Sequence, residues 1–340
     1  MKVLSFVIPA YNSESFLDKC IPSMLHPEVL EKLEIIVVND GSKDGTAEVA
    51  QKYCEKYPET VRLINQENKG HGGALNTGCG AACGKYLKVI DADDWVETEN
   101  LPQLLNLLEE TENDVVLCHY RTHDISSGEI KDWKCDPPVF AESCTLESVM
   151  KNWRSFYHLL TFHGILYRRD FYQKLGIRLS EHVFYEDYEF AAFPCCHAAG
   201  IMPVDLFLYD YRIGDVNQSV SDASKLKRIG HMETVLRRMI RESGNNSLTQ
   251  AGKDYAAVKT QELLLSYLTI VLLAEPDKKT GRRKAKEMME VFREEFPAAY
   301  GLAEKKYRVF CLMNRFHISN AAWKRFADSG LYRKLRGKGI

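Results

Sequence analysis

Three carboxylates stand within four positions at the end of a short strand-like run, and this cluster limits most strongly what the chain can fold into. Residues 86–90 are rich in aromatic and β-branched side chains and predict a strand. Asp91, Asp93 and Asp94 follow, with no basic residue between them. Because repulsion among carboxylates is costly, a bound Mg²⁺ or Mn²⁺ is the simplest source of relief. The alternative is a solvated acidic turn that begins a helix, and the carboxylates alone favour neither interpretation.

The composition is that of an ordinary globular protein. Of the 340 residues, 45% are hydrophobic and 27% are charged, which suits one large domain with an accessory region, or two domains. The formal net charge of −2 argues against a dedicated nucleic-acid-binding protein, because phosphate contacts need a basic surplus.

The cysteines and the apolar runs indicate in which cellular compartment the protein is expected. None of the ten cysteines belongs to a Cys-x-x-Cys pair, so we expect reduced, mostly buried thiols rather than disulfides or a metal site. The apolar run at residues 3–8 ends at Pro9 and is too short to span a membrane, and we recognise no other apolar stretch of that length. These features predict a cytoplasmic protein.

Strands alternate with helices through the first third of the chain. Nearly all-apolar runs predict strands, and segments with helical periodicity lie between them. The expected strands are residues 3–8, 34–38, 61–65, 86–90 and 114–118. This alternation predicts an α/β fold with a mostly parallel central sheet and helices on both faces.

Four loops that follow strands should meet at one edge of such a sheet, because parallel crossovers share one handedness. They are residues 9–12, 39–42, 68–73 and 91–94. Their convergence predicts a nucleotide site.

Several side chains in these loops suit a nucleotide. Tyr11 offers a ring for stacking, and Asp40 can accept the imide N–H of a uracil ring; the alternatives are packing for Tyr11 and a helix cap for Asp40. Gly70, Gly72 and Gly73 allow the backbone to approach a phosphate or ribose at a helix start.

The order of these motifs resembles the family 2 glycosyltransferases, which have the GT-A fold and transfer sugars from nucleotide donors with inversion. The resemblance is dense over residues 3–118 and sparser to residue 221. The matching segments are Val7-Ile8-Pro9-Ala10-Tyr11-Asn12, residues 35–46, Asn68-Lys69-Gly70, Ala74-Leu75-Asn76-Thr77-Gly78 and Asp91-Ala92-Asp93-Asp94. A Rossmann-like GT-A domain is therefore expected at residues 1–221, followed by a helical region at residues 222–340.

The resemblance implies roles for individual residues. Asp93 is expected to bind the metal, with Asp91 near the donor's ribose and sugar and as a second metal contact. The remaining donor contacts are expected at Pro9, Tyr11, Asp40, Asn68, Gly70, Gly73, Asn76 and Ala92. The chain departs from the family pattern at His71-Gly72-Gly73, where many members carry other residues.

The second half adds a carboxylate pair, Glu186 and Asp187, at the start of an apolar-periodic helix. Such a pair is usually a capping feature that complements the helix dipole. Inverting transfer also needs a carboxylate as general base, and Asp187 matches the family's base position, with Glu186 in support. Arg212 and Ser219 resemble a segment that closes over the diphosphate, although an exposed arginine and a turn serine fit equally well.

The last forty residues are both apolar and basic. Such a segment can lie on an anionic membrane surface, which would suit a lipid-linked acceptor; the alternative is an amphipathic helix packed on the domain.

Taken together, the residues and the resemblance to family 2 glycosyltransferases predict a metal-dependent inverting glycosyltransferase that uses a nucleotide sugar, UDP-linked by preference. The acceptor would be a glycan or a lipid-linked hydroxyl in cell-surface polysaccharide synthesis, and the enzyme would work in the cytoplasm or at the inner face of the membrane. Two alternatives stay open. One is a catalytically silent module that binds a sugar nucleotide or glycan, and the other is a same-fold transferase of another phosphate-linked group.

Overall fold

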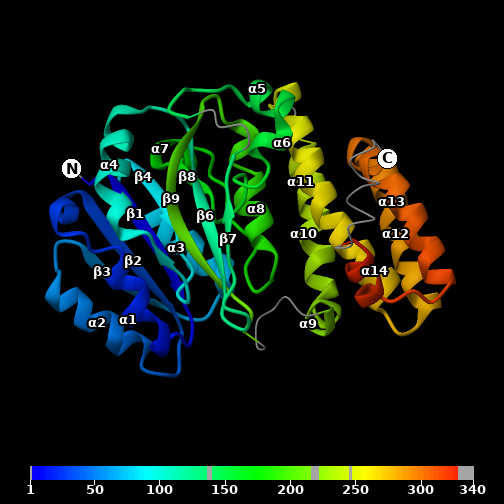
Figure 1. Cartoon of the computed structure of the whole chain (residues 1–340), viewed down its shortest axis with the longest axis horizontal. Coiled ribbons are helices and arrows are strands. Elements are labelled where there is room, and N and C mark those ends of the chain that lie inside the picture. Colours follow the sequence, from blue (N-terminus) through cyan, green and yellow to red (C-terminus); the bar gives the residue numbers. More distant parts are fainter. Residues whose placement is uncertain (1, 136–139, 216–221, 245–246, 328–340) are drawn as a thin grey trace. The chain divides into compact units, whose positions relative to one another are not determined.

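The computed structural model describes residues 2–135, 140–215, 222–244 and 247–327. Contacts divide the chain into two compact units (Figure 1). The first unit comprises Met1–Gln218 and Leu248–Tyr255, and the second comprises Ser219–Ser247 and Ala256–Ile340. The first unit thus includes a short piece of later chain, which a single boundary after residue 221 does not anticipate.

The first unit is built on one nine-stranded sheet. Its strands are β1 (Leu4–Ala10), β2 (Leu33–Asp40), β3 (Val61–Gln66), β4 (Tyr86–Val89), β5 (Trp95–Val96), β6 (Val115–Asp124), β7 (Ile130–Trp133), β8 (Ile165–Arg168) and β9 (Ile201–Ile213). The order is β3-β2-β1-β4-β8-β6-β9-β5, and β7 pairs with β6. Every residue of β1 and β2 is buried, as continuous apolar runs predict.

Half of the sheet is parallel. Strands β3, β2, β1 and β4 run parallel to one another, as does the pair β6–β9. Strand β8 lies between β4 and β6 and runs antiparallel to both, and β5 and β7 also pair antiparallel. The α/β class with a helical C-terminal region is confirmed, but the sheet is mixed where a mostly parallel one is predicted. The difference arises because β6 continues into a hairpin with β7, and the chain then returns along β8 in the opposite direction.

Most helices of the first unit come directly after a strand in the sequence. They are α1 (Glu14–Ser23), α2 (Thr46–Lys56), α3 (Gly70–Ala81), α4 (Leu101–Glu110), α5 (Leu146–Lys151), α6 (Trp153–Phe156), α7 (Arg169–Lys174) and α8 (Glu186–Ala192). Because parallel crossovers are right-handed, α1 and α2, which step from β1 to β2 to β3, cover one face of the sheet. Helix α3 steps back from β3 to β4 and therefore covers the other.

The second unit is helical within its described residues. Its helices are α9 (Asp222–Lys227), α10 (Ile229–Ser243), α12 (Lys278–Glu295), α13 (Pro297–Arg315) and α14 (Asn320–Ala327), and α11 (Gln250–Thr269) runs into it from the first unit. A π-helical turn at Ile270–Ala274 extends α11.

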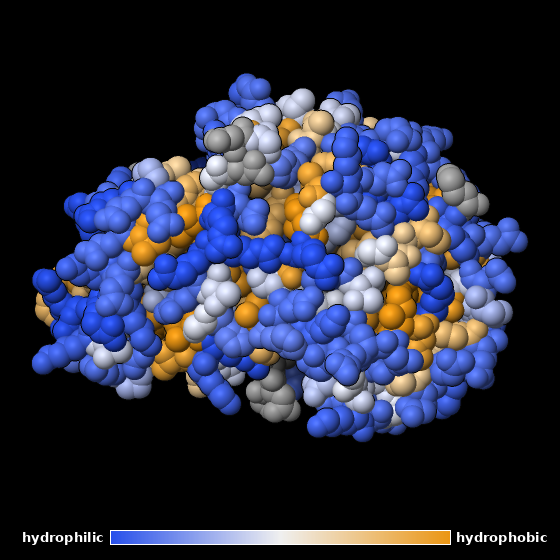
Figure 2. Space-filling view, turned by 180° about the vertical axis from the view of Figure 1, so that it is seen from behind, coloured by the Kyte–Doolittle hydropathy of each residue, from blue (hydrophilic) through white to orange (hydrophobic). Residues whose placement is uncertain are grey.

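One helical stretch, Gln250–Ala274, is long and apolar enough to cross a membrane, which the sequence reading missed. About two thirds of its apolar window (67%) is buried within the protein, as in the core helix of a globular chain. The surface seen from behind is mostly hydrophilic, with separate hydrophobic patches (Figure 2).

Candidate active site

Hydrogen bonds tie together the loops that follow β1, β2 and β3. Asn12 accepts a bond from the backbone N–H of Lys43 at 2.9 Å, and its own N–H donates to Ser42 Oγ at 3.0 Å. The Asn68 side chain donates to the carbonyl of Asp40 at 2.9 Å. The predicted convergence of these loops at one sheet edge is confirmed.

The Asp40 carboxylate is a structural centre of this edge. It is 2% exposed, and its Oδ1 accepts bonds from Gln66 Nε2 (2.6 Å) and from the backbone N–H of Lys69 (2.8 Å). Pro9 lies buried in β1, whereas Tyr11 is 49% exposed just beyond that strand. An exposed ring beside a buried carboxylate is compatible with base stacking, and the base-binding roles of these three residues stay predictions.

The three carboxylates after β4 have different environments. Asp94 is 1% exposed; its Oδ1 accepts the backbone N–H of Arg212 at 2.7 Å and its Oδ2 accepts the Tyr209 hydroxyl. Burial, together with the charges of Asp91 and Asp93, raises the pKa of Asp94 well above its ordinary value. Asp94 therefore anchors β9 and is not available to a ligand.

Asp91 is paired with a histidine that the sequence reading did not select. His71 Nε2 lies 2.9 Å from Asp91 Oδ1, and His71 Nδ1 lies 2.6 Å from Glu186 Oε1. Burial opposes the charged imidazolium, but Asp91 and Glu186 together raise the pKa of His71 well above its ordinary value. A protonated His71 thus links the loop after β4 to the start of α8. The available signal was a lone histidine within a glycine run, in a loop predicted to face carboxylates.

Asp93 is the carboxylate of the three that best fits a metal. Its side chain is about one third exposed, and Arg212 Nη1 approaches its Oδ2 only to 3.9 Å. Burial and the nearby Asp91 charge raise the pKa of Asp93 to about 6. A divalent cation would relieve this repulsion, so Asp93, with the partly exposed Asp91 beside it, fits Mg²⁺ or Mn²⁺ as a hard oxygen donor. Within the described ranges, no group of three His, Cys, Asp or Glu residues forms a complete protein metal cage, and diphosphate oxygens and water would have to complete the shell.

Helix α8 carries the predicted base. Tyr185, at its N-cap, has a φ of 78°, a left-handed conformation that is uncommon for a residue with a side chain and costs strain. Burial, followed by the charge of Glu186, raises the pKa of Asp187 to about 7. A half-buried carboxylate with a pKa near neutrality suits proton abstraction at physiological pH.

Glu186 is more buried than its neighbour. It is 5% exposed, and its Oε1 faces His71, while its Oε2 is buried with no hydrogen-bond partner among the described groups. Glu186 therefore holds His71 and raises the pKa of Asp187. Its predicted role in support of the base stays a prediction.

The glycines in the first turn of α3 make room for the chain itself. Gly70 has a φ of +75°, and a Cβ there would lie 2.9 Å from the backbone nitrogen of His182. A Cβ on Gly72 would lie 2.1 Å from the carbonyl oxygen of Ser180. The segment before α8 thus occupies the space next to these glycines. We find no need for a phosphate to explain either position, and the donor contacts expected at Gly70 and Gly73 stay predictions.

Gly72→Ala should therefore cost stability. We expect it to lower the free energy of unfolding by about 1–3 kcal/mol, because the carbonyl of Ser180 must move away. The matched control is Gly80→Ala in the same helix, where a Cβ meets nothing within 4 Å. That control should be neutral or stabilising by about 0.5 kcal/mol, because alanine favours helix. Urea unfolding of the two variants checks the prediction, and equal stabilities would contradict it.

Asn76 and Lys88 each hold a segment of the second half of the first unit. Asn76 Nδ2 donates to the carbonyl of Leu179 at 2.9 Å, and its Oδ1 accepts the N–H of Leu179 at 2.7 Å, so this predicted donor contact holds the segment before α8. Lys88, fully buried in β4, was missed. Its Nζ donates to the carbonyls of Phe162, His163 and Ile165, and burial lowers its pKa to about 7. Its position in the middle of an otherwise apolar strand could have indicated a structural role for Lys88.

The remaining predicted contacts lie around the loop after β4. Ala92 is buried within that loop. Arg212, in β9, donates from Nη2 to Asp215 at 3.0 Å and lies near Asp93, as a phosphate contact beside a metal would. Ser219 lies outside the described residues, so its predicted role has no structural counterpart.

Comparisons with known proteins identify the family of the chain. The family model described as glycosyl transferase family 2 matches residues 5–176, just over half of the chain. The uncharacterized glycosyltransferase EpsJ of Bacillus subtilis (strain 168) is 30% identical over 215 residues, which cover 62% of this chain and 61% of EpsJ. The chain spans 18–61% of the length of three curated relatives that it matches, EpsJ among them.

Solved structures share the fold at low sequence identity. The S. aureus protein TarS (residues 1–349), in complex with UDP-GlcNAc, aligns with a TM-score of 0.60 at 19% identity, covering 94% of this chain and 93% of that one. A mannosyltransferase from Pyrobaculum calidifontis, in complex with GDP-Man and Mn²⁺, aligns with a TM-score of 0.51 at 20% identity, covering 96% and 88%. The GT-A-type fold is confirmed, and the chain belongs to glycosyl transferase family 2.

Proposed function

We propose that this chain transfers a sugar, with inversion, from a nucleotide-sugar donor to a hydroxyl group of a glycan or lipid-linked acceptor. The observation that carries the proposal is Asp187: a half-buried carboxylate with a pKa of about 7, electrostatically coupled to Asp91 and His71. A general base at the edge where nucleotide-binding loops converge suits group transfer from a bound nucleotide. The complexes of TarS with UDP-GlcNAc and of the mannosyltransferase with GDP-Man support a nucleotide-sugar donor.

The mechanism follows from the positions of the carboxylates. Asp187 takes the proton of the acceptor hydroxyl as that oxygen attacks the anomeric carbon, and the bond to the donor's diphosphate breaks on the opposite side. Arg212 lies where it can neutralise part of the charge on the departing diphosphate. His71 holds the loop of Asp91 and the start of α8 at a fixed separation, so that donor and base are aligned.

Mg²⁺ or Mn²⁺ would be held by Asp93 with Asp91 beside it. When bound, such an ion stabilises negative charge on the diphosphate. The Mn²⁺ in the mannosyltransferase complex supports this choice of cofactor.

A UDP-linked donor, a role in cell-surface polysaccharide synthesis and a cytoplasmic location complete the proposal. The UDP-GlcNAc complex of TarS supports the first. The relative named minor teichoic acid biosynthesis protein GgaB, 31% identical over 112 residues, supports the second. All ten cysteines are free, which suits a reducing compartment.

Tyr11→Ala should weaken UDP binding by about two- to tenfold, because stacking on an aromatic ring is worth about 0.5–1.5 kcal/mol. The ring is half exposed, so its removal should leave the fold intact. Tyr11→Phe keeps the ring and serves as the matched control, with affinity close to that of the parent. Titration calorimetry with UDP measures all three proteins. Failure of the parent to bind UDP would contradict the proposed donor, and equal affinity of the Ala and Phe variants would contradict the stacking role.

A further inference from the structure

Helix α13, in the second unit, has two hydrophobic faces. One face is buried and includes Ala299, Ala303, Phe310 and Met313. The other face is exposed, and its side chains recur at spacings of seven, three and four residues, so they lie along one side of the helix. Its members are Leu302, Val309, Leu312 and, at the C-cap, Phe316, with exposures of 49, 49, 54 and 71%. We call these four residues the apolar stripe. Single exposed hydrophobic residues are ordinary, but a row of four along one helix indicates a contact surface.

Basic side chains accompany the apolar stripe. Lys305 lies within the same helical face, and Arg308 and Arg315 lie beside it; all three are exposed. Arg308 pairs with Glu304 one helical turn away. Among the described residues, neither Lys305 nor Arg315 forms an ion pair with an acidic side chain, so their charges are available to a partner.

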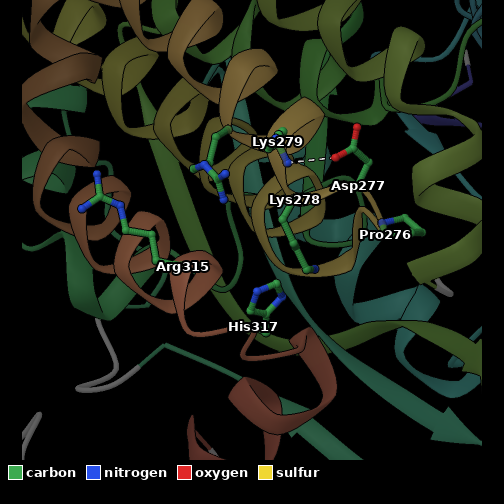
Figure 3. A pocket seen from close by; sticks show the side chains of 7 residues that line it. Pro276, Asp277, Lys278, Lys279, Arg315 and His317 are labelled. Atoms are coloured by element: carbon green, nitrogen blue, oxygen red, sulfur yellow. Dashed lines mark hydrogen bonds between the residues drawn. The ribbon is translucent and has the colours of Figure 1, made fainter.

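An open pocket at the end of α13 adds further positive charge (Figure 3). Its volume is about 840 Å³, and its lining residues are Pro276, Asp277, Lys278, Lys279, Arg282, Arg315 and His317. In Figure 3, Arg315 and His317 lie on one side of this space, and Lys278 and Lys279 on the other. Four permanent cations thus face one carboxylate, and we call this the basic pocket.

Two of the four cations are held in place by the chain. Lys278 Nζ donates to the carbonyls of Leu273 (3.3 Å) and Glu275 (2.9 Å), and Arg282 donates to Asn314 Oδ1. Lys279 and Arg315 are exposed. The pocket is therefore a fixed positive site with two outward charges, which suits a phosphate group.

We propose that the apolar stripe and the basic pocket form a docking surface for an anionic lipid bilayer. An exposed apolar helix face bordered by Lys and Arg is the pattern that lies at a membrane interface, with the hydrophobic side chains at the boundary of headgroups and acyl chains. The basic residues then meet lipid phosphates, and their charge complements an anionic surface. The surface belongs to α13 and the start of α12, and is thus more sharply defined than a basic C-terminal segment. Its role in delivering a lipid-linked acceptor rests on the proposed function.

The test is co-sedimentation of the full chain with vesicles of phosphatidylcholine, with and without phosphatidylglycerol. The parent should bind the anionic vesicles, and salt should weaken the binding. The double variant Lys279→Glu/Arg315→Glu should bind at least about 30-fold more weakly, because each basic residue near an anionic surface contributes about a factor of five and the two new carboxylates are repelled by that surface. Leu312→Ser/Phe316→Ser should lose about tenfold or more, because two apolar side chains no longer insert.

Two exposed residues of the first unit provide matched controls. Ile130 is 60% exposed and Lys151 has a 73% exposed side chain, so Ile130→Ser and Lys151→Glu repeat the same changes of chemistry elsewhere. Both controls should bind vesicles like the parent. Circular dichroism should show all variants to be folded, since every substituted side chain is exposed.

Three results would contradict the proposed docking surface. In the first, the parent protein fails to bind anionic vesicles, and in the second, it binds neutral and anionic vesicles equally well. In the third, the two double variants bind anionic vesicles as tightly as the parent does. A parent that dimerises by light scattering, with the dimer lost in Leu312→Ser/Phe316→Ser, would assign the stripe to a second copy instead. Turnover of a UDP-sugar in the absence of vesicles should be unchanged in both double variants, so failure of docking and failure of the proposed function are distinguishable.

Discussion

Asp187→Asn should lower the rate of sugar transfer by about 100- to 10,000-fold, while the protein still binds UDP. Removal of a general base has an effect of this size because the acceptor hydroxyl must then lose its proton to water. Asparagine keeps the size and polarity of the side chain and removes only its basicity. Transfer is measured by UDP release in the presence of acceptor, and binding by calorimetry.

The pH profile separates a base from a structural carboxylate. Since the pKa of Asp187 is about 7, kcat/KM of the parent should fall about tenfold per pH unit below pH 7 and level off above it. The fall of kcat/KM below pH 7 should be absent from the pH profile of Asp187→Asn. A carboxyl whose pKa is raised on folding lowers the stability of the protein progressively as pH rises from its ordinary pKa to about 7, so the variant should be at least as stable as the parent above pH 7. Asp170→Asn, at a 71% exposed side chain, is the matched control and should retain full activity. A variant that keeps its transfer rate, or loses it only by unfolding, would contradict the base assignment.

His71→Ala should destabilise the protein by about 3 kcal/mol. The change leaves the buried carboxylate of Glu186 next to Asp91 and Asp187 with no compensating cation, and breaking such a pair by removing one partner is strongly unfavourable. The value lies at the low end of the range for buried pairs because His71 and Asp91 are about one third exposed. Urea unfolding near pH 6 measures the loss.

The double variant His71→Ala/Glu186→Gln tests the cause. Glutamine removes the stranded charge, so the double variant should be more stable than His71→Ala alone, which is non-additive behaviour. The contribution of His71 is present below its ordinary pKa and disappears as pH rises through its raised folded value, whereas that of the lowered Asp91 carboxyl disappears in acid. The destabilisation should therefore be greatest between about pH 4 and pH 7. Additive effects of the two substitutions would indicate that His71 merely fills space.

Much of the parallel part of the sheet, strands β1 to β4, could be predicted from the sequence, because buried parallel strands are continuous apolar runs with polar loops after them. The expected strands at residues 34–38 and 61–65 are β2 (Leu33–Asp40) and β3 (Val61–Gln66). Asp93 and Asp187 could be selected as candidates because paired carboxylates at a strand end and at a helix start have recognisable chemistry. Both have pKa values raised by burial, as functional carboxylates often do.

The features that sequence reasoning missed depend on contacts between distant residues. His71 contacts Glu186, which lies 115 residues away in the sequence, and Tyr209 contacts Asp94 at the same sequence separation. No local sequence pattern can therefore predict either hydrogen bond. Strand β8 is a short apolar run whose direction is set by pairing with β4 and β6. The glycines at residues 70–73 suggested a phosphate-binding site. The atoms nearest to Gly70 and Gly72 are instead backbone atoms of His182 and Ser180.

The most direct test of the central claim is UDP release from a panel of UDP-sugars, with Mn²⁺ or Mg²⁺ and with a chelator. Donor hydrolysis does not require the acceptor to be known. We predict release from one UDP-sugar that depends on the divalent ion and is lost in Asp93→Ala. If no UDP-sugar is turned over and UDP does not bind in calorimetry, the assignment of this chain as a UDP-sugar transferase is contradicted; binding without turnover would instead favour a silent sugar-nucleotide-binding module.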